Sequence, residues 1–167
     1  MPLSEEYVRM CTIGELTPLA APIVLVEYDP QFPDRFRYEA ERVCAALGER
    51  ALRVEHVGST SIPGLIAKPI IDIILVVPDS AEEAAYVSVF ETAGYRLRVR
   101  EPEWYEHRMF KGGEDDVNLH VFSMGCPEVD RMVDFRDWLR TNEDDRELYA
   151  RTNTMPATPV SAANRVH

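Results

Sequence analysis

The chain has 167 residues, of which 46% are hydrophobic and 28% charged, so we expect a single domain over residues 1–167 rather than a disordered or fibrous protein. A net charge of −11 argues against a nucleic-acid partner, since such binding depends on basic side chains that neutralise phosphates. Scattered cysteines, no signal peptide and no long apolar stretch together predict a cytoplasmic protein with no membrane partner.

The first half of the chain predicts three strands and a helix. Residues 22–30 (PIVLVEYDP) form a short apolar run, which we interpret as a strand. From Pro33 to Gly48, apolar residues recur at helical spacing. Residues 51–58 alternate between apolar and polar, and residues 69–77 (PIIDIILVV) are β-branched enough to predict a strand buried on both faces.

The second half predicts a hairpin between two helices. The expected elements are a helix opened by Asp79 or Ser80 and closed by Gly94, strands at 95–99 and 105–110, a turn at 111–116, a strand at 117–123 and a helix from about 127 to 139. The fold class is therefore α+β, with a small mixed, mostly antiparallel sheet flanked by helices. We expect the core within 23–150 and a poorly ordered tail over 152–167.

The segment from Gly58 to Lys68 is rich in glycine and hydroxyl residues. Its backbone N–H groups and hydroxyls suit a phosphate or carboxylate ligand, with candidate contacts at Gly58, Ser59, Thr60 and Ser61. Lys68 adds a positive charge where the next strand begins, because Pro69 forces an extended backbone. An alternative is that the glycines only allow a tight turn, while the hydroxyls bind local backbone.

Asp72 is a carboxylate inside an isoleucine-rich strand. An unpaired charge in apolar surroundings costs several kcal/mol, so Asp72 requires a metal, a cation or several donors as partners. The alternative is a structural ion pair, for which Arg108 is the candidate. Because Asp72 lies near the glycine-rich segment, we expect Asp72 and Lys68 to be catalytic, and Arg108 to bind the anion.

Three further polar residues are candidates for this site. His120 is the polar member of a half-apolar strand face, so it is either a ligand or a satisfied core histidine. Glu55 and His56 adjoin the glycine-rich segment and point to opposite faces, so one of them shares the side of Asp72. We expect His56 to contact the ligand, and Asp72, His120 and Glu55 to hold Mg²⁺ or Mn²⁺.

Four stretches of the sequence resemble blocks of the GrpB family in the same order. They are YDPQFPDRF (28–36), EHVGSTSIPGLIAKPIIDI (55–73), NLHVF (118–122) and FRDWLR (135–140). The resemblance spans residues 23–150, and it implies a nucleotidyltransferase-like fold. It further implies that Gly58 and Ser59 form the phosphate-contacting turn and that Asp72 is the first metal-binding carboxylate.

The sequence departs from the active nucleotidyltransferases at two acidic positions. Ile74 stands where a second carboxylate is usual, and His120 stands where the third is expected. The site therefore either holds a single ion or binds a nucleotide without turning it over. The C-terminal tail also lacks the lysine-containing helix with which other members of the family continue.

Two functions follow as hypotheses. The first is a protein that binds a nucleotide or another small phosphate-bearing ligand, with metal-dependent nucleotidyl transfer as its chemical extension. The second is a non-catalytic accessory domain that supports the folding or regulation of dephospho-CoA kinase, because the resemblance implies fusions with that enzyme.

Overall fold

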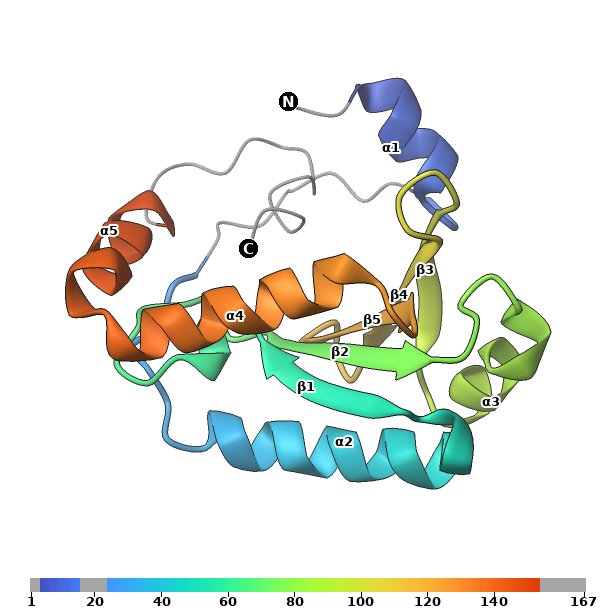
Figure 1. Ribbon diagram of the computed structural model, residues 1–167, viewed down its shortest axis with the longest axis horizontal. Coiled ribbons are helices and arrows are strands. Elements are labelled where there is room, and N and C mark those ends of the chain that lie inside the picture. The colour runs from blue at the N-terminus through green and yellow to red at the C-terminus, as the bar shows by residue number, and fades with distance from the viewer. Residues whose placement is uncertain (1–3, 16–23, 154–167) are drawn as a thin grey trace.

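One five-stranded sheet forms the centre of the computed structural model, which describes residues 4–15 and 24–153 (Figure 1). The strands follow the order β1-β2-β5-β4-β3. Their bounds are β1 (Arg53–Val57), β2 (Ile71–Val77), β3 (Arg96–Glu101), β4 (His107–Gly112) and β5 (Val117–Ser123). β2 and β5 run parallel, and every other neighbouring pair is antiparallel. The predicted α+β class with a mixed, mostly antiparallel sheet is confirmed.

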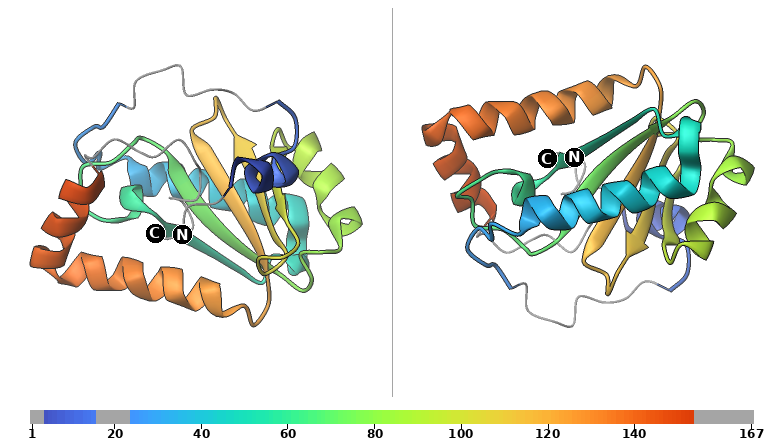
Figure 2. Two further views of the ribbon diagram at one scale, coloured as in Figure 1. Left: turned by 90° about the horizontal axis from the view of Figure 1, so that it is seen from above. Right: turned by 90° about the horizontal axis from the view of Figure 1, so that it is seen from below.

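Helices cover both faces of the sheet (Figure 2). The helices are α1 (Glu5–Cys11), α2 (Phe32–Leu47), α3 (Val87–Thr92), α4 (Pro127–Thr141) and α5 (Glu143–Asn153). Figure 1 shows α2 below the β1–β2 part of the sheet and α4 above it, with α3 at one end. The helix predicted between Pro33 and Gly48 is therefore present as α2, and Gly48 follows it with a positive φ of 64°.

β2 is buried on both faces, as its isoleucine-rich sequence predicts. Ile71, Ile73 and Leu75 belong to the core on the α2 side of the sheet. Ile74 and Val76 belong to the second core, which α4 closes. Asp72 shares the alternation of Ile74 and Val76, so its side chain lies on the α4 side.

Two sequence predictions about elements are wrong. Within the described residues, the segment predicted as a strand over 22–30 makes only an isolated bridge between Val26 and Ala67; residues 22 and 23 lie outside them. Val26 packs against the core, so this apolar run covers the sheet instead of joining it. The helix expected from Asp79 or Ser80 begins only at Val87.

The late start of α3 has a physical cause. The Asp79 carboxylate accepts the Ala81 N–H, and the Ser80 hydroxyl donates to the Glu106 carbonyl and contacts the Ser123 hydroxyl. The Asp79 bond is local, whereas the Ser80 contacts are tertiary and use a hydroxyl that would otherwise cap a helix. At the C-terminal end, α5 includes residues 152 and 153, and the rest of the predicted tail lies outside the described residues. No described helix is long and apolar enough to cross a membrane.

Candidate functional site

Asp72 lies directly over the glycine turn that follows β1. Val57 pairs with Asp72 in the sheet, so the next residue, Gly58, passes beneath the carboxylate. A Cβ atom at Gly58 would lie 2.6 Å from Asp72 Oδ2, and the φ of Gly58 is +76°. Both the close approach and the left-handed backbone therefore require glycine here. The Asp72 side chain retains 25% of its exposure, so the carboxylate is open to a ligand.

Two residues of β5 bind the other Asp72 oxygen. The Asn118 amide donates to Asp72 Oδ1 over 3.0 Å, and His120 Nε2 lies 3.3 Å from the same atom. The parallel register explains this grouping, because Asp72 pairs with Asn118 and Ile74 pairs with His120. The structure thus brings together Asp72 and His120, which the sequence analysis expected to converge, and adds Asn118.

Two lysines supply positive charge near this carboxylate. Lys111 of β4 pairs with Asn118, which places it on the same face of the sheet as Asp72. Burial lowers the pKa of Lys111, the Asp72 charge acts to raise it, and the Lys68 charge acts to lower it. Lys68 is exposed and precedes β2. The charges of Asp72 and Lys68 therefore lie close enough to Lys111 to act on it.

The hydroxyl groups of Thr60 and Ser61 bind the backbone. Both residues are buried, and they donate to the carbonyls of Ile70 and Gly58 respectively. This is the arrangement of the alternative interpretation, in which hydroxyls stabilise the turn. Ser59 is less buried, and its hydroxyl lies 3.4 Å from the Tyr149 hydroxyl of α5.

His56 lies on the opposite face of the sheet from Asp72. It pairs with Ile73, stacks on Phe36 of α2 with 4.8 Å between ring centroids, and bonds Thr60 Oγ1 through Nε2 over 2.9 Å. Since the Thr60 hydroxyl donates to Ile70, His56 Nε2 must carry the proton of this bond. Burial lowers the pKa of His56 to about 4, so the ring is neutral and holds the turn in place.

Glu55 shares the face of Asp72 but is bound to arginines. Its carboxylate lies 2.7 Å from Arg136 of α4 and 3.2 Å from Arg53. Burial raises the pKa of Glu55, but the hydrogen bonds from Arg136 and Arg53 together lower it by more, so the net shift is downward. Arg136 also donates to the His56 carbonyl over 2.9 Å. Glu55 therefore connects α4 to β1 and is not placed beside Asp72 and His120 as a metal ligand.

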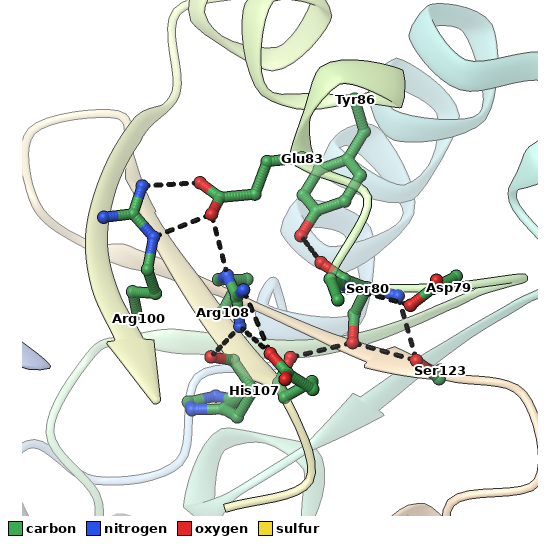
Figure 3. Close-up of polar contacts among 10 residues, drawn as sticks. Asp79, Ser80, Glu83, Tyr86, Arg100, His107, Arg108 and Ser123 are labelled. Atoms are coloured by element: carbon green, nitrogen blue, oxygen red, sulfur yellow. Dashed lines mark hydrogen bonds and ion pairs between the residues drawn. The ribbon is translucent and has the colours of Figure 1, made fainter. Parts of the chain in front are cut away.

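Arg108 is not part of this site, which corrects its assignment as an anion contact. Met109 pairs with His120, so Met109 and His107 lie on the face of the sheet that carries His120. Arg108, between them in the strand, points to the opposite face, on the α3 side. Figure 3 shows its guanidinium beside Glu83, and it also lies 3.1 Å from Glu106. Its side chain is 4% exposed, so Arg108 is a structural ion-pair partner without access to an anion.

The side chains near Asp72 offer few donors for Mg²⁺ or Mn²⁺. The described residues contain no cluster of three or more histidine, cysteine, aspartate or glutamate side chains placed to hold a metal. Asn118 Oδ1 is nevertheless buried without a hydrogen-bond partner among those residues, beside the Asp72 carboxylate. One carboxylate and one amide oxygen do not suit two ions, but they do suit one ion whose remaining ligands come from a phosphate and water.

Sequence reasoning missed three polar residues on this side of the sheet: Asn118, His107 and Lys111. His107 Nε2 lies 3.0 Å from His120 Nδ1, so it contacts the site from the neighbouring strand. A signal was available, because the predicted hairpin at 111–116 makes the strands on either side antiparallel neighbours. What the pattern did not specify was the register between them.

A hollow of about 600 Å³ lies elsewhere, beside α2. Its walls include Ile71 and Val117, whose side chains point to the α2 side of the sheet, and Asp72 does not line it. Carboxylates outnumber the single cation in its walls, Arg35, which lies 2.7 Å from Asp116. This charge disfavours a phosphate there, so the candidate site remains at Asp72.

Comparison with known proteins identifies the family. The sequence profile described as GrpB protein matches residues 22–161. The UPF0157 protein BH1888 of Halalkalibacterium halodurans is 59% identical over 150 residues, which cover 90% of this chain and 77% of that protein. The crystal structure of conserved protein GrpB from Enterococcus faecalis has a TM-score of 0.69 at 32% identity, covering 76% of this chain and 78% of that one.

A longer protein also contains a matching segment. The dephospho-CoA kinase of Mycobacterium tuberculosis is 33% identical over 157 residues, and the match covers 77% of this chain but 38% of the kinase. The family profile and the first of these relatives together decide the assignment. The chain belongs to the GrpB family.

Proposed function

We propose that this chain binds a nucleotide or another phosphate-bearing ligand beside Asp72. The observation that carries the proposal is the packing of a partly exposed carboxylate against the glycine turn, with Gly58 leaving no room for a side chain between them. A carboxylate inside a strand is costly, and the neighbours that Asp72 contacts among the described residues are Asn118 and His120. Its second oxygen lies against Gly58, so a ligand would contact the exposed part of the Asp72 side chain beside the turn.

The negative charge of Asp72 determines which further groups are needed for a phosphate to bind beside it. A phosphate and the Asp72 carboxylate repel one another, so their approach requires cations between or around them. Lys68 and Lys111 provide two such charges. One Mg²⁺ or Mn²⁺ ion held by Asp72 and shared with the phosphate would provide more, and the ion would neutralise charge on the phosphate.

Metal-dependent nucleotidyl transfer is the extension of this proposal. It draws support from the family resemblance and from the position of Asp72 next to the turn. In this extension Asp72 would hold the ion, and Lys68 would contact a phosphate oxygen. Ile74 in place of a second carboxylate is the feature that limits the site to one ion.

The test is a thermal-shift titration of the full chain with each of the four ribonucleoside triphosphates, with Mg²⁺ or Mn²⁺. A ligand at about 100 times its Kd stabilises a protein by about 2.7 kcal/mol, which corresponds to a rise in Tm of about 5–10 °C for a domain of this size. We expect such a rise in the wild type and its loss in Asp72→Asn. Asp130→Asn is the matched control, because Asp130 lies on α4 with a side chain that is 74% exposed.

Two outcomes would contradict the proposal. One is no rise in Tm with any nucleotide, and the other is an equal rise in Asp72→Asn. A rise accompanied by pyrophosphate release supports transfer, whereas a rise without release supports binding alone.

A second candidate function comes from the longer relatives. Because a dephospho-CoA kinase contains a segment similar to this chain, we propose as the alternative that the chain acts as an accessory domain of such a kinase. The chain should then co-elute in size-exclusion chromatography with a dephospho-CoA kinase that lacks the segment. Separate elution at micromolar concentrations of both proteins would remove this candidate.

A further inference from the structure

Of the 18 lysine and arginine side chains in the sequence, only two are lysines, and both lie near Asp72. Lys68 shortly precedes β2, whose second residue is Asp72. Lys111 lies on β4, and the strand register places it in one row of the sheet with Asn118 and Asp72. With about 4.8 Å between neighbouring strands, the backbones at Lys111 and Asp72 are about 10 Å apart, which a lysine side chain can largely bridge.

The two lysines differ from most of the arginines in having no carboxylate partner. Within residues 4–15 and 24–153, the ammonium groups of Lys68 and Lys111 take part in no ion pair or hydrogen bond. Arg96, which pairs with Lys111 in the sheet, is by contrast bound to Asp115. In a chain with a net charge of −11, carboxylates are in excess, so a cation without one is not explained by the stability of the fold.

A third cation, Arg98 of β3, belongs to the same cluster. Its guanidinium donates to the backbone carbonyl of Glu15 over 2.8 Å and not to a carboxylate. Burial lowers the pKa of Lys111, and the charges of Arg98 and Lys68 act in the same direction against that of Asp72. The three positive charges therefore lie within electrostatic range of one another, and together they attract anions to the open side of Asp72.

The positions of these cations indicate an extended anion. Lys68 lies before β2, Lys111 on β4 and Arg98 on β3, so the charges are spread across the sheet and do not converge on one point. A single phosphate beside Asp72 would leave the outer cations without a partner, whereas a row of phosphates can contact each in turn. The lysine ammonium suits this contact, because its three donors can bind oxygens of successive phosphates.

We infer that Lys111, together with Lys68 and Arg98, binds the phosphate chain of a polyphosphate ester, and that Lys111 selects nucleoside di- and triphosphates over monophosphates. The inference rests on the proposed function, which places one phosphate beside Asp72. It adds the direction in which the remaining phosphates extend, across β5 toward β4 and β3.

The first test compares ligands that differ in the number of phosphates. Isothermal titration calorimetry is carried out on the full chain with the mono-, di- and triphosphates of the four ribonucleosides in Mg²⁺. We expect a triphosphate to bind at least about 10-fold more tightly than its monophosphate, because it gains charge-assisted hydrogen bonds. Lys111→Met should weaken triphosphate binding by about 10- to 100-fold and monophosphate binding by less than about 3-fold.

Arg50→Met is the matched control for the loss of one positive charge. Like Arg98, Arg50 is exposed and donates to a backbone carbonyl, that of Ala85, over 2.8 Å. It lies near the opposite end of β2 from Asp72, since the Leu52 N–H bonds the Val76 carbonyl. We expect this variant to bind all the nucleotides as the wild type does. Equal weakening in Arg50→Met and Lys111→Met would reduce the effect to net charge and overturn the inference.

A second measurement does not require the Lys111 variant to fold. Because the chain has two lysines, labelling with ¹³C,¹⁵N-lysine gives two sets of side-chain signals, and Lys68→Arg leaves only those of Lys111. In the wild type, we expect a bound triphosphate to shift the Lys111 signals and a bound monophosphate to leave them nearly unchanged. Lys111 signals that stay in place while a triphosphate binds would overturn the inference.

The titrations also separate this inference from the proposed function. If none of the nucleotides binds, the proposed function fails, and the inference fails with it. If nucleotides bind and Asp72→Asn abolishes binding, but neither the number of phosphates nor Lys111→Met changes the Kd, the proposed function stands and the role of Lys111 is wrong.

Discussion

At the scale of single residues, Gly58 is the position where the backbone and the site depend on each other most directly. Its φ of +76° excludes most side chains, and its Cβ position is occupied by the Asp72 carboxylate. Gly64 shares the first constraint, with a φ of +81°, but nothing lies within 4 Å of its Cβ position. The pair therefore separates the cost of a left-handed backbone from the cost of steric overlap.

We expect Gly64→Ala to lower the free energy of unfolding by about 1–2 kcal/mol through backbone strain alone. Gly58→Ala should lower it by more, about 3 kcal/mol or above, because Asp72 must also move. Urea denaturation of both variants measures the difference. In Gly58→Ala the nucleotide-induced rise in Tm should also be lost. Equal destabilisation of the two variants would show that the carboxylate does not press on the turn.

His56 gives the fold a dependence on pH. Its pKa of about 4 lies below the ordinary value of 6.5, so the unfolded chain binds more protons between these two pH values. The stability contributed by neutral His56 is therefore present above pH 6.5 and is lost as the pH falls toward 4. By linkage, the free energy of unfolding should fall by about 2 kcal/mol from this residue between pH 7 and pH 5.

The variant that checks this dependence is His56→Gln, whose amide does not titrate and can still donate to Thr60. We expect it to be less stable than the wild type at pH 7, because the stacking on Phe36 is weakened. Its loss of stability between pH 7 and pH 5 should be smaller by about 2 kcal/mol, measured by urea denaturation at both pH values. Parallel pH profiles for the two proteins would rule out His56 as the titrating group.

At the scale of elements, the sequence predicted most strands because alternation and β-branching are local signals. The apolar recurrence that predicted α2 is equally local. The strand predicted at 22–30 failed because an apolar run can cover a core without pairing, and pairing with Ala67 is a tertiary event. The predicted start of α3 was wrong for the same reason, since Ser80 binds residues that are distant in sequence.

The sequence predicted the site residues that can be recognised within a single strand. It missed those whose position depends on how two strands align. Alternation alone shows that His107 and Arg108 point to opposite faces, but it does not show which of them faces Asp72. The pairing of Met109 with His120 decides the matter in favour of His107. The same lack of register leaves the choice between Glu55 and His56 open in the sequence, and the pairing of Glu55 with Ile74 decides it in favour of Glu55.

At the scale of the whole molecule, the sheet consists of two antiparallel groups of strands. β1 and β2 form one group, and β3, β4 and β5 form the other. The parallel pairing of β2 with β5 is the hydrogen-bonded junction between them. Gly58 and Asp72 come from the first group, whereas Asn118, His120 and His107 come from the second.

This junction has a consequence for the order of folding. Each antiparallel group closes through short chain segments, while the parallel contact must wait for a long excursion of the chain to return, which carries a larger entropic cost. Asp72 consequently meets its polar neighbours from β5 only when the two halves dock. A folding intermediate with either half formed alone lacks the grouping of Asp72 with Asn118 and His120, so the appearance of the proposed ligand binding during refolding would time the last step of assembly.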